Sequence, residues 1–331
     1  GGEGEREGGR ARERGESMAE NGRVSIPDHP TFELDGLIRS CLSEDLGDRG
    51  DITSLATVGD SVTASGVFVA KEGGVVAGVE VAERVFAMVD DAGVSRSWSV
   101  KDGGRVERGD VIGTIEGKAR SVLKAERLAL NFMQRMSGVA TLTSTMRDKL
   151  FGSGAKILDT RKTVPGLRVL DKWAVLLGGG TSHRIGLYDM MMIKDNHIAA
   201  AGGIEEALRA ADSYLSEQGL SVPVEVEVET LDQVDQVLTY LRANPKTFLT
   251  RVMLDNMVVR RAEGGDGYDT SLLEKSVAKI EGKLETEASG NINLDSVEAV
   301  GRTGVQFISS GALTHSVRAL DISLKLKTNA A

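Results

Sequence analysis

The chain has 331 residues and a formal net charge of −9, and 40% of its residues are hydrophobic. This length allows two domains, and the hydrophobic fraction is typical of a globular protein. The acidity and the aromatic content of only 4% argue against a nucleic-acid-binding protein, which needs cations for phosphates and rings that stack on bases. The single cysteine, Cys41, excludes an internal disulfide and a cysteine-rich zinc site. No apolar run approaches the roughly 20 residues of a membrane helix.

Residues 1–25 are mostly Gly, Glu and Arg and have almost nothing to bury, so we expect a disordered tail. This tail is as acidic as it is basic, which does not match an organellar transit peptide. Because the chain begins with Gly, the native start is not visible. We expect a cytoplasmic or plastid protein.

The first third of the chain predicts a small α/β domain. Residues 31–46 place apolar side chains at helical spacing, with Thr31 as the expected N-cap. Residues 61–116 contain short alternating runs rich in Val and Gly, which are typical of short strands joined by tight turns.

A long helix is predicted over residues 119–150, with Gly138 expected to break or kink it. Arg127 lies four residues before Asn131 on one polar face, and Arg135 continues that face. The spacing alone supports a ligand-binding face and a solvated face equally.

After residue 155, short apolar runs alternate with helical segments, which predicts a parallel sheet. The strand-like runs are KILD, MMMIK, PVEVEVE, RVMLD, LETEA and VQFIS. The helical segments are 168–177, 203–218, 231–243, 270–281, 294–301 and 315–326. No G-x-G-x-x-G follows the first strand, so a dinucleotide-binding sheet is not supported.

The run PVEVEVE favours a barrel over an open sheet. Its valines face one way in a strand, whereas Glu225, Glu227 and Glu229 face the other. A central strand of an open parallel sheet would be apolar on both faces. In a barrel the acidic face points to the interior, where it needs cationic partners. A solvent-exposed edge strand is the alternative.

The segment from Asp159 to His197 supplies those cations, since it holds six Lys or Arg, four Asp and no Glu. Polar groups follow every strand of this half, and strand ends at the C-terminal face of a barrel carry the active site. We therefore expect an enzyme whose cationic subsite binds carboxylates. Its predicted members are Arg161, Lys162, His183, Arg184 and Lys194. Any single Lys–Asp pair could instead be a surface ion pair.

Two further subsites are expected at the same rim. Glu227 and Asp255 are suited to sugar hydroxyls or Mg²⁺. The turns Ser289-Gly290-Asn291 and Ser309-Ser310-Gly311 lead into helices, where free backbone N–H groups can hold a phosphate. Together the subsites fit a phosphoribosyl donor and an acidic acceptor.

At this point the residues resemble a known family, quinolinate phosphoribosyltransferase, also called nicotinate-nucleotide diphosphorylase (carboxylating). The similarity covers about residues 32–326. It is carried by LGDRGDITS, AERLALNFMQRMSGVATLT, DTRKTVPGLR, GGGTSHRIGLYDMMMIKDNH, VEVEVETL, MLDNM, EASGNINL and SSGALTHSVRALDISLKL. The extra residues in NPKTFLTRVMLDNM resemble plant and algal members more than bacterial ones.

The resemblance implies an α/β fold: an N-terminal α/β sandwich over residues 26–145 and an irregular seven-stranded α/β barrel over 146–331. It implies a homodimer, in which Arg127 reaches the quinolinate of the neighbouring subunit. By the same matching, the five predicted cations surround quinolinate and the donor, and Glu227 and Asp255 lie at the ribose and its metal. The two late turns, including Ser310 and Gly311, match the loops that bind the 5′-phosphate.

The implied reaction converts quinolinate and phosphoribosyl pyrophosphate into nicotinate mononucleotide, pyrophosphate and CO₂, with Mg²⁺ on the pyrophosphate. Lys162, Lys194, Glu227 and Asp255 are the expected catalytic residues. Two alternatives are a nicotinate phosphoribosyltransferase, which would release no CO₂, and a Schiff-base lyase using Lys162 or Lys194. The number of cations favours a dicarboxylate.

Overall fold

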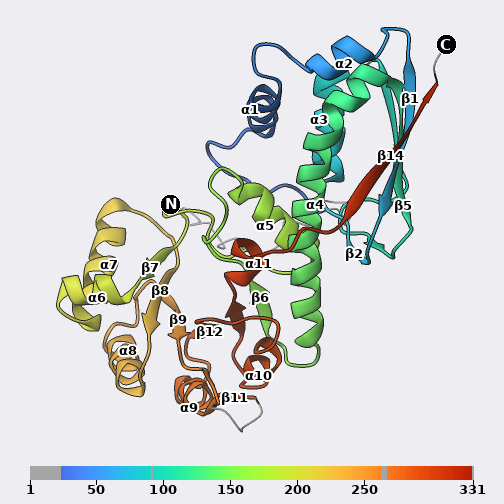
Figure 1. Cartoon of the computed structure of the whole chain (residues 1–331). Coiled ribbons are helices and arrows are strands. Elements are labelled where there is room, and N and C mark those ends of the chain that lie inside the picture. Colours follow the sequence, from blue (N-terminus) through green and yellow to red (C-terminus); the bar gives the residue numbers. More distant parts are fainter. Residues whose placement is uncertain (1–23, 91, 262–266, 330–331) are drawn as a thin grey trace, which may run out of the picture.

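The computed structural model describes residues 24–90, 92–261 and 267–329, and it contains two sheets joined by one long helix (Figure 1). Most of the predicted disordered tail, residues 1–23, lies outside the described residues. The prediction is wrong at Val24, whose carbonyl accepts a hydrogen bond from Trp173 Nε1 at 3.2 Å and whose side chain packs against the core. Val24 is therefore packed against the rest of the protein, although composition placed it in the tail.

An antiparallel four-stranded sheet with the order β14-β1-β5-β3 forms the first part. Its strands are β1 (Thr63–Ala70), β3 (Val94–Trp98), β5 (Val111–Lys118) and β14 (Ile322–Asn329). A short ribbon pairs β2 (Gly74–Val75) with β4 (Arg105–Val106). The associated helices are α1 (Leu34–Leu46), α2 (Ile52–Thr57) and α3 (Val79–Asp90).

Two local predictions in this part are wrong. Helix α1 has Glu33 as its N-cap residue and no side-chain cap, so Thr31 does not start it. Helix α3 was not predicted, because its valines continue the Val- and Gly-rich run of the strands before it. Its buried residues Val81, Ala82, Val85 and Phe86 nevertheless recur at helical spacing.

The end of the chain returns to the first sheet. We expected a helix over 315–326 within the barrel domain, but only α11 (Ala312–His315) is helical and β14 follows it. Strand β14 pairs antiparallel with β1, and Leu324 lies opposite Phe68. The reason is the period of two in DISLKLK, where apolar and polar side chains alternate. The predicted barrel domain, residues 146–331, therefore includes a strand that belongs to the other sheet.

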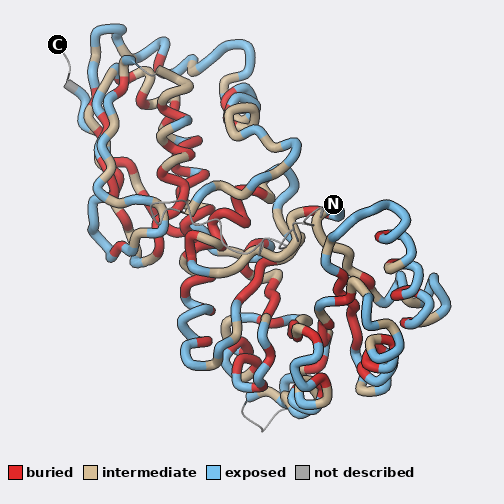
Figure 2. Tube along the Cα trace, turned by 180° about the vertical axis from the view of Figure 1, so that it is seen from behind, coloured by how far each residue is buried: buried red, intermediate tan, exposed pale blue. Residues whose placement is uncertain are grey.

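Helix α4 (Ala119–Lys149) is 31 residues long and joins the two parts. It packs on α3 and the first sheet, and farther along on α5 and β6 of the second part. Much of its length is buried (Figure 2). Gly138 does not end the helix. A Cβ atom at this position would lie 2.3 Å from the carbonyl oxygen of Arg318, so the glycine lets the returning chain lie against the helix.

The second part is built on a parallel six-stranded sheet with the order β6-β13-β12-β9-β8-β7. Its strands are β6 (Lys156–Leu158), β7 (Met191–Ile193), β8 (Val224–Val228), β9 (Leu249–Asp255), β12 (Glu285–Ser289) and β13 (Phe307–Ser309). The resemblance implied seven strands, but this sheet has six among the described residues, and beside β6 lies only one parallel bridge, between Thr181 and Leu158. The stretch around Thr181 is too rich in Gly, Ser and charge to continue as a strand.

Helices lie between these strands (Figure 1), and all of them except α6, which was not predicted, are close to where apolar spacing placed them. They are α5 (Arg168–Leu177), α6 (Asp195–Ala201), α7 (Ile204–Gln218), α8 (Leu231–Ala243), α9 (Ser271–Ile280) and α10 (Val297–Gly301). A small hairpin pairs β10 (Val259–Arg260) with β11 (Tyr268–Asp269). Among the described residues, no helix is both long and apolar enough to cross a membrane.

A candidate active site

The parallel register brings the polar residues of neighbouring strands into rows. Glu225 lies beside Arg251, and Arg251 lies beside Glu285. Farther along the strands, Asp255 at the end of β9 lies beside Ser289 at the end of β12. Because successive side chains of a strand alternate faces, these rows collect charged groups on one side of the sheet.

A cavity of about 810 Å³ opens beside β7. Three of the five predicted cations line it: Arg161, Arg184 and Lys194. Apolar residues complete its wall, among them Tyr188, Met190, Met191, Met192 and Tyr214. A cavity with an apolar wall and converging cations suits a flat, anionic ligand.

The side chains of Arg161 and Arg184 form no ion pair with a carboxylate of the described chain. Burial, together with the positive charge of Arg161, lowers the pKa of the Arg184 guanidinium. The buried Nε of Arg161 has no hydrogen-bond partner among the described residues. The charges of Glu225 and Asp189 oppose this lowering only in part and form no ion pair with Arg184, so this corner of the cavity favours a bound anion.

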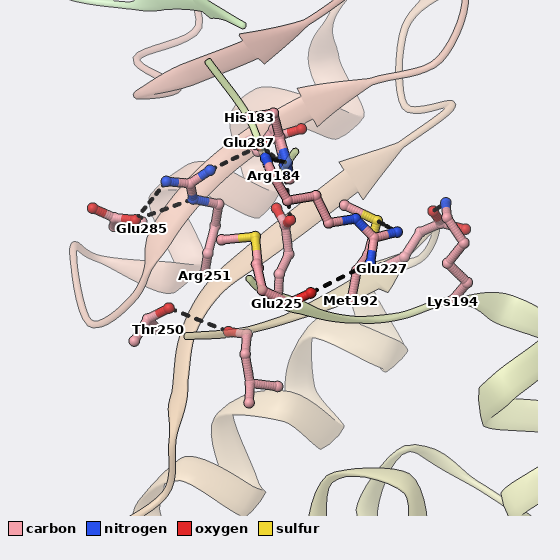
Figure 3. A network of polar contacts seen from close by, with 12 residues as sticks. His183, Arg184, Met192, Lys194, Glu225, Glu227, Thr250, Arg251, Glu285 and Glu287 are labelled. Carbon is pink, nitrogen blue, oxygen red and sulfur yellow. Dashed lines mark hydrogen bonds and ion pairs between the residues drawn. The ribbon is translucent and has the colours of Figure 1, made fainter. Parts of the chain in front are cut away.

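Lys194, the N-cap residue of α6, reaches across to β8. Its Nζ donates to Glu227 Oε2 at 2.5 Å, and the Glu227 side chain is only 9% exposed (Figure 3). The predicted partnership between the acidic strand and the cationic segment is thus confirmed for this pair. His197 caps the same helix start by accepting from the Lys194 backbone N–H, which is a structural role.

His183 does not line the cavity. Its side chain is 4% exposed, and its Nε2 lies 3.1 Å from both Glu225 and Glu287 (Figure 3). Arg251 donates to Glu287 at 3.1 Å and to Glu285 at 2.9 Å. The ring therefore belongs to an ion network inside the sheet, which differs from its predicted place in the cationic subsite.

The network binds protons tightly. Burial lowers the pKa of His183, because it opposes a charged ring. The carboxylates of Glu287 and Glu225 have the larger effect and raise the pKa of His183 to about 10. Burial and the charge of Glu287 raise the pKa of Glu225 to about 7. A ring charged by the extra proton would carry hydrogen on both nitrogens. The backbone N–H of Arg184 donates to His183 Nδ1 at 2.7 Å, which instead favours a neutral ring with its hydrogen on Nε2 and the extra proton on a carboxylate. Whether the ring or a carboxylate carries the extra proton, His183, Glu225 and Glu287 together hold one proton more than the same groups would hold in isolation.

The prediction that both late turns lead into helices holds for Ser309-Ser310-Gly311, which is followed directly by α11, but not for Ser289-Gly290-Asn291, because α10 begins only at Val297. Gly290 has φ +98°, and a Cβ atom there would lie 2.4 Å from Asn256 Oδ1. Asp255 accepts from Asn256 Nδ2 at 2.7 Å. Ser310 is buried, and its hydroxyl donates to the Ile292 carbonyl, which ties one turn to the other. The hydroxyl of Ser310 is therefore used within the protein.

Lys162 and Gly311 lie together. A Cβ atom at Gly311 would come within 2.9 Å of Lys162 Cδ, so this glycine makes room for the lysine side chain. The Lys162 carbonyl also accepts from Thr314 Oγ1 at 2.8 Å. The lysine is thereby placed beside the predicted phosphate turn and away from the lining of the cavity.

Arg127 is exposed on α4 and is absent from the lining of the cavity. The third member of its predicted polar face has a structural role, because Arg135 forms an ion pair with buried Asp171 at 2.8 Å. Within one chain, Arg127 is therefore not brought together with the other predicted cations.

Two groups could hold a metal ion. His183, Glu225 and Glu287 present ligand-type atoms within 4.8 Å of one another. However, Glu287 Oε2 already contacts both His183 and Arg251, so the network supplies its own cations. Glu227 and Asp255 remain the expected donors for Mg²⁺, which prefers one or two carboxylates together with substrate phosphates.

Several residues of these networks were missed from the sequence. Glu287 and Arg251 lie on runs that were recognised only as strands. The alternation of Glu285 with Glu287 carries the same signal as that of Glu225 with Glu227. Lys172, which donates to buried Asp159, gave no signal, because a lysine in an amphipathic helix is expected at the surface.

Comparison with known proteins agrees with this geometry. The quinolinate phosphoribosyl transferase C-terminal domain model matches residues 139–325, and the N-terminal domain model matches residues 51–137. The chain belongs to the quinolinate phosphoribosyltransferase family. The sequence-based assignment of the family is therefore confirmed.

Individual relatives are similar over most of their length. Quinolinate phosphoribosyltransferase [decarboxylating] 1b of Nicotiana tabacum is 54% identical over 93% of this chain and 86% of the relative. The chloroplastic nicotinate-nucleotide pyrophosphorylase [carboxylating] of Oryza sativa is 52% identical, over 96% of this chain and 85% of the relative. The solved structure of NadC from Streptococcus pyogenes has a TM-score of 0.80 and 35% identity, and it covers 92% of this chain and 100% of its own.

Proposed function

We propose that this member of the family transfers a phosphoribosyl group from phosphoribosyl pyrophosphate to quinolinate and releases CO₂, giving nicotinate mononucleotide. The observation that carries the proposal is the pair Arg161 and Arg184 in one cavity, neither of them in an ion pair with a described carboxylate. Quinolinate carries two carboxylates, which would pair with these two guanidinium groups. A guanidinium binds a carboxylate through two parallel hydrogen bonds.

In the proposed reaction the pyridine nitrogen attacks C1 of the ribose as pyrophosphate leaves. The cations hold the acceptor, and the acids lie where positive charge develops on the sugar. Glu227 and Asp255 are the residues for this task. Once the ring nitrogen is cationic, the adjacent carboxylate can leave as CO₂, because the electron pair left behind lies next to positive charge. That electron pair then takes up a proton from solvent, and hydrogen replaces the carboxylate on the ring carbon. The side chains mainly orient the substrates and match their charge.

Glu227 and Asp255 would also hold Mg²⁺, since both are carboxylates at the ends of neighbouring strands. The ion would neutralise charge on the pyrophosphate when bound. Lys162 beside Gly311, together with the Ser289-Gly290-Asn291 turn, would bind the phosphates of the donor.

We further propose that the protein works as a homodimer in which Arg127 enters the cavity of the partner. Arg127 is exposed, and the cavity wall carries exposed apolar side chains, with Leu187 at 71% and Tyr188 at 54%. On α2 of the other part, Ile52 is 62% exposed and Leu55 is 56% exposed. Exposed apolar side chains of this kind are stabilised when a partner subunit covers them and removes them from water.

For the compartment we propose a plastid. Two relatives at 52% identity, from Oryza sativa and Arabidopsis thaliana, are named chloroplastic. A fluorescent protein fused to the C-terminus of the native gene product should mark plastids in a plant cell. A signal spread through the cytosol would contradict this part of the proposal.

The activity is tested by supplying quinolinate labelled in its 2-carboxylate together with phosphoribosyl pyrophosphate. Labelled CO₂ should appear in a one-to-one ratio with nicotinate mononucleotide, and only when a divalent cation is present. Product formation from nicotinate without CO₂ would favour a nicotinate phosphoribosyltransferase instead. Trapping of substrate on a lysine by borohydride would favour a Schiff-base lyase.

A further inference from the structure

The segment from Thr181 to Met190 is held by side chains instead of a sheet. Its only strand-like contact among the described residues is the bridge at Thr181. Beyond that bridge, the N–H of His183 donates to Asp159 at 2.8 Å, and the N–H of Arg184 donates to the His183 ring at 2.7 Å. The next two N–H groups both donate to Asp189 at 2.8 Å. Four consecutive backbone donors are thus satisfied by side chains, which fixes an otherwise irregular segment.

The guanidinium of Arg184 has much weaker contacts than its backbone. It lies 3.4 Å from the Met190 carbonyl and 3.4 Å from the Met192 sulfur, which is a poor acceptor. Figure 3 shows the side chain extending from the His183 network toward Met192 and Lys194. The direction of this cation therefore depends mainly on where its backbone is held.

The His183 ring links that backbone to the interior of the sheet. Its Nδ1 accepts from Arg184, so in this arrangement its Nε2 carries the proton and faces Glu225 and Glu287. Both carboxylates are fully buried, and Arg251 holds Glu287 from the other side. A ring that uses both nitrogens has one allowed orientation, which the two carboxylates set.

We propose that Glu287 and Glu225 are positioning residues for the dicarboxylate substrate. They fix the His183 ring, the ring fixes the peptide N–H of Arg184, and the Arg184 guanidinium is thereby held in the cavity that Arg161 also lines. Neither glutamate lines that cavity, so both act through Arg184. His183 acts in the same way and need not touch the substrate. This inference rests on the proposed function, because it assumes that the cavity binds quinolinate.

The test is Glu287→Gln, which keeps the shape of the side chain and removes its charge. Glu285→Gln is the matched control, because Glu285 lies two residues away on β12 and also pairs with Arg251, yet it is 45% exposed and does not contact His183. The measurements are the Kd of quinolinate by calorimetry without the donor, and kcat with the KM of each substrate. For Glu287→Gln we expect Kd and KM for quinolinate to rise about tenfold, while KM for the donor changes less than about twofold. The control should stay within about twofold of wild type in all four.

A folded Glu287→Gln protein that binds quinolinate like the control would overturn the inference. If that variant does not fold, Glu225→Gln is measured instead, since Glu225 makes the same 3.1 Å contact to the ring. Equal weakening for both substrates would also count against it, because a general loss of structure does not select one ligand. The proposed function fails separately, if the wild-type protein neither binds quinolinate nor releases CO₂ from it.

Discussion

Lys194 and Glu227 neutralise each other across neighbouring strands, with Nζ 2.5 Å from Oε2. Each also belongs to a different proposed subsite, the lysine to the acidic pyridine and the glutamate to the ribose. Substrates must therefore compete with this ion pair for both side chains. Before the substrates bind, Lys194 neutralises the nearly buried carboxylate of Glu227.

We predict that Lys194→Ala abolishes most activity and lowers the free energy of unfolding by about 1–2 kcal/mol. The Glu227 side chain is only 9% exposed, so it loses its partner while still largely desolvated. Urea unfolding and the CO₂ assay measure the two effects. Lys279→Ala is the control, because its pair with Asp235 is exposed at 37% and 53%. It should change stability by less than about 1 kcal/mol and leave activity intact. Similar results for the two variants would show that the Lys194 pair has no special role.

Arg161→Ala and Arg127→Ala are each predicted to reduce turnover by at least about a hundredfold, as expected when a charged contact to a substrate is lost. If Arg127 acts in the cavity of a partner, the two inactive variants should complement each other when they are mixed under conditions that exchange subunits. One of the two sites of each mixed dimer then has both arginines. Activity should recover to about a quarter of wild type for random exchange, because half of the dimers are mixed and each has one intact site.

No recovery, despite demonstrated subunit exchange, would mean that Arg127 serves its own chain or no site at all. Lys149→Ala, at the far end of the same helix, is a suitable control for a change of surface charge. It should have wild-type activity alone and in mixtures.

Much of this arrangement could be predicted from the sequence, because local patterns encode it. Helices α5 and α8 begin and end at the predicted residues, since apolar spacing and flanking turns mark them. The alternation in PVEVEVE correctly indicated acids that face cations. The alternation in DISLKLK marks β14 as a strand, but its pairing with β1 could not be predicted, because β1 lies more than 200 residues earlier and no local pattern identifies the partner of a strand. The contact between His183 and Glu287 was not predicted for a similar reason, since Glu287 approaches the ring from a distant strand.

Stability should fall as pH rises from about 7 to 10. The folded state raises the pKa of His183 from 6.5 to about 10, because the ring shares the extra proton of the network with Glu225 and Glu287. The contribution of this proton is complete below 6.5 and is lost as pH rises through 10. The raised pKa of Glu225, about 7, acts in the same direction between 4.5 and 7, because the folded state again binds more protons. Each tenfold gain in proton affinity on folding contributes about 1.4 kcal/mol to the free energy of unfolding.

Thermal unfolding at pH 6, 7, 8, 9 and 10 tests this expectation. The slope should be smaller in His183→Gln, which has no titrating ring. A wild-type profile that is flat or rises over this range would show that the His183 network does not hold the extra proton.

Gly290→Ala should impair use of the phosphoribosyl donor. Gly290 has φ +98°, and the new Cβ atom would lie 2.4 Å from Asn256 Oδ1 and 2.7 Å from the Asn256 backbone nitrogen. Asn256 must then move, and with it the end of β9 that carries Asp255. We expect KM for the donor to rise about tenfold or more, with a smaller change in KM for quinolinate.

Gly282→Ala separates crowding from backbone strain. Gly282 has φ +71°, also in the left-handed region, but a Cβ atom there would meet nothing within 4 Å. Both variants should lose about 1 kcal/mol of stability from the strained backbone. Only Gly290→Ala should change the steady-state constants, because only there does the added carbon displace a residue next to the proposed ribose site. Equal kinetics for the two variants would remove the Ser289-Gly290-Asn291 turn from the donor site.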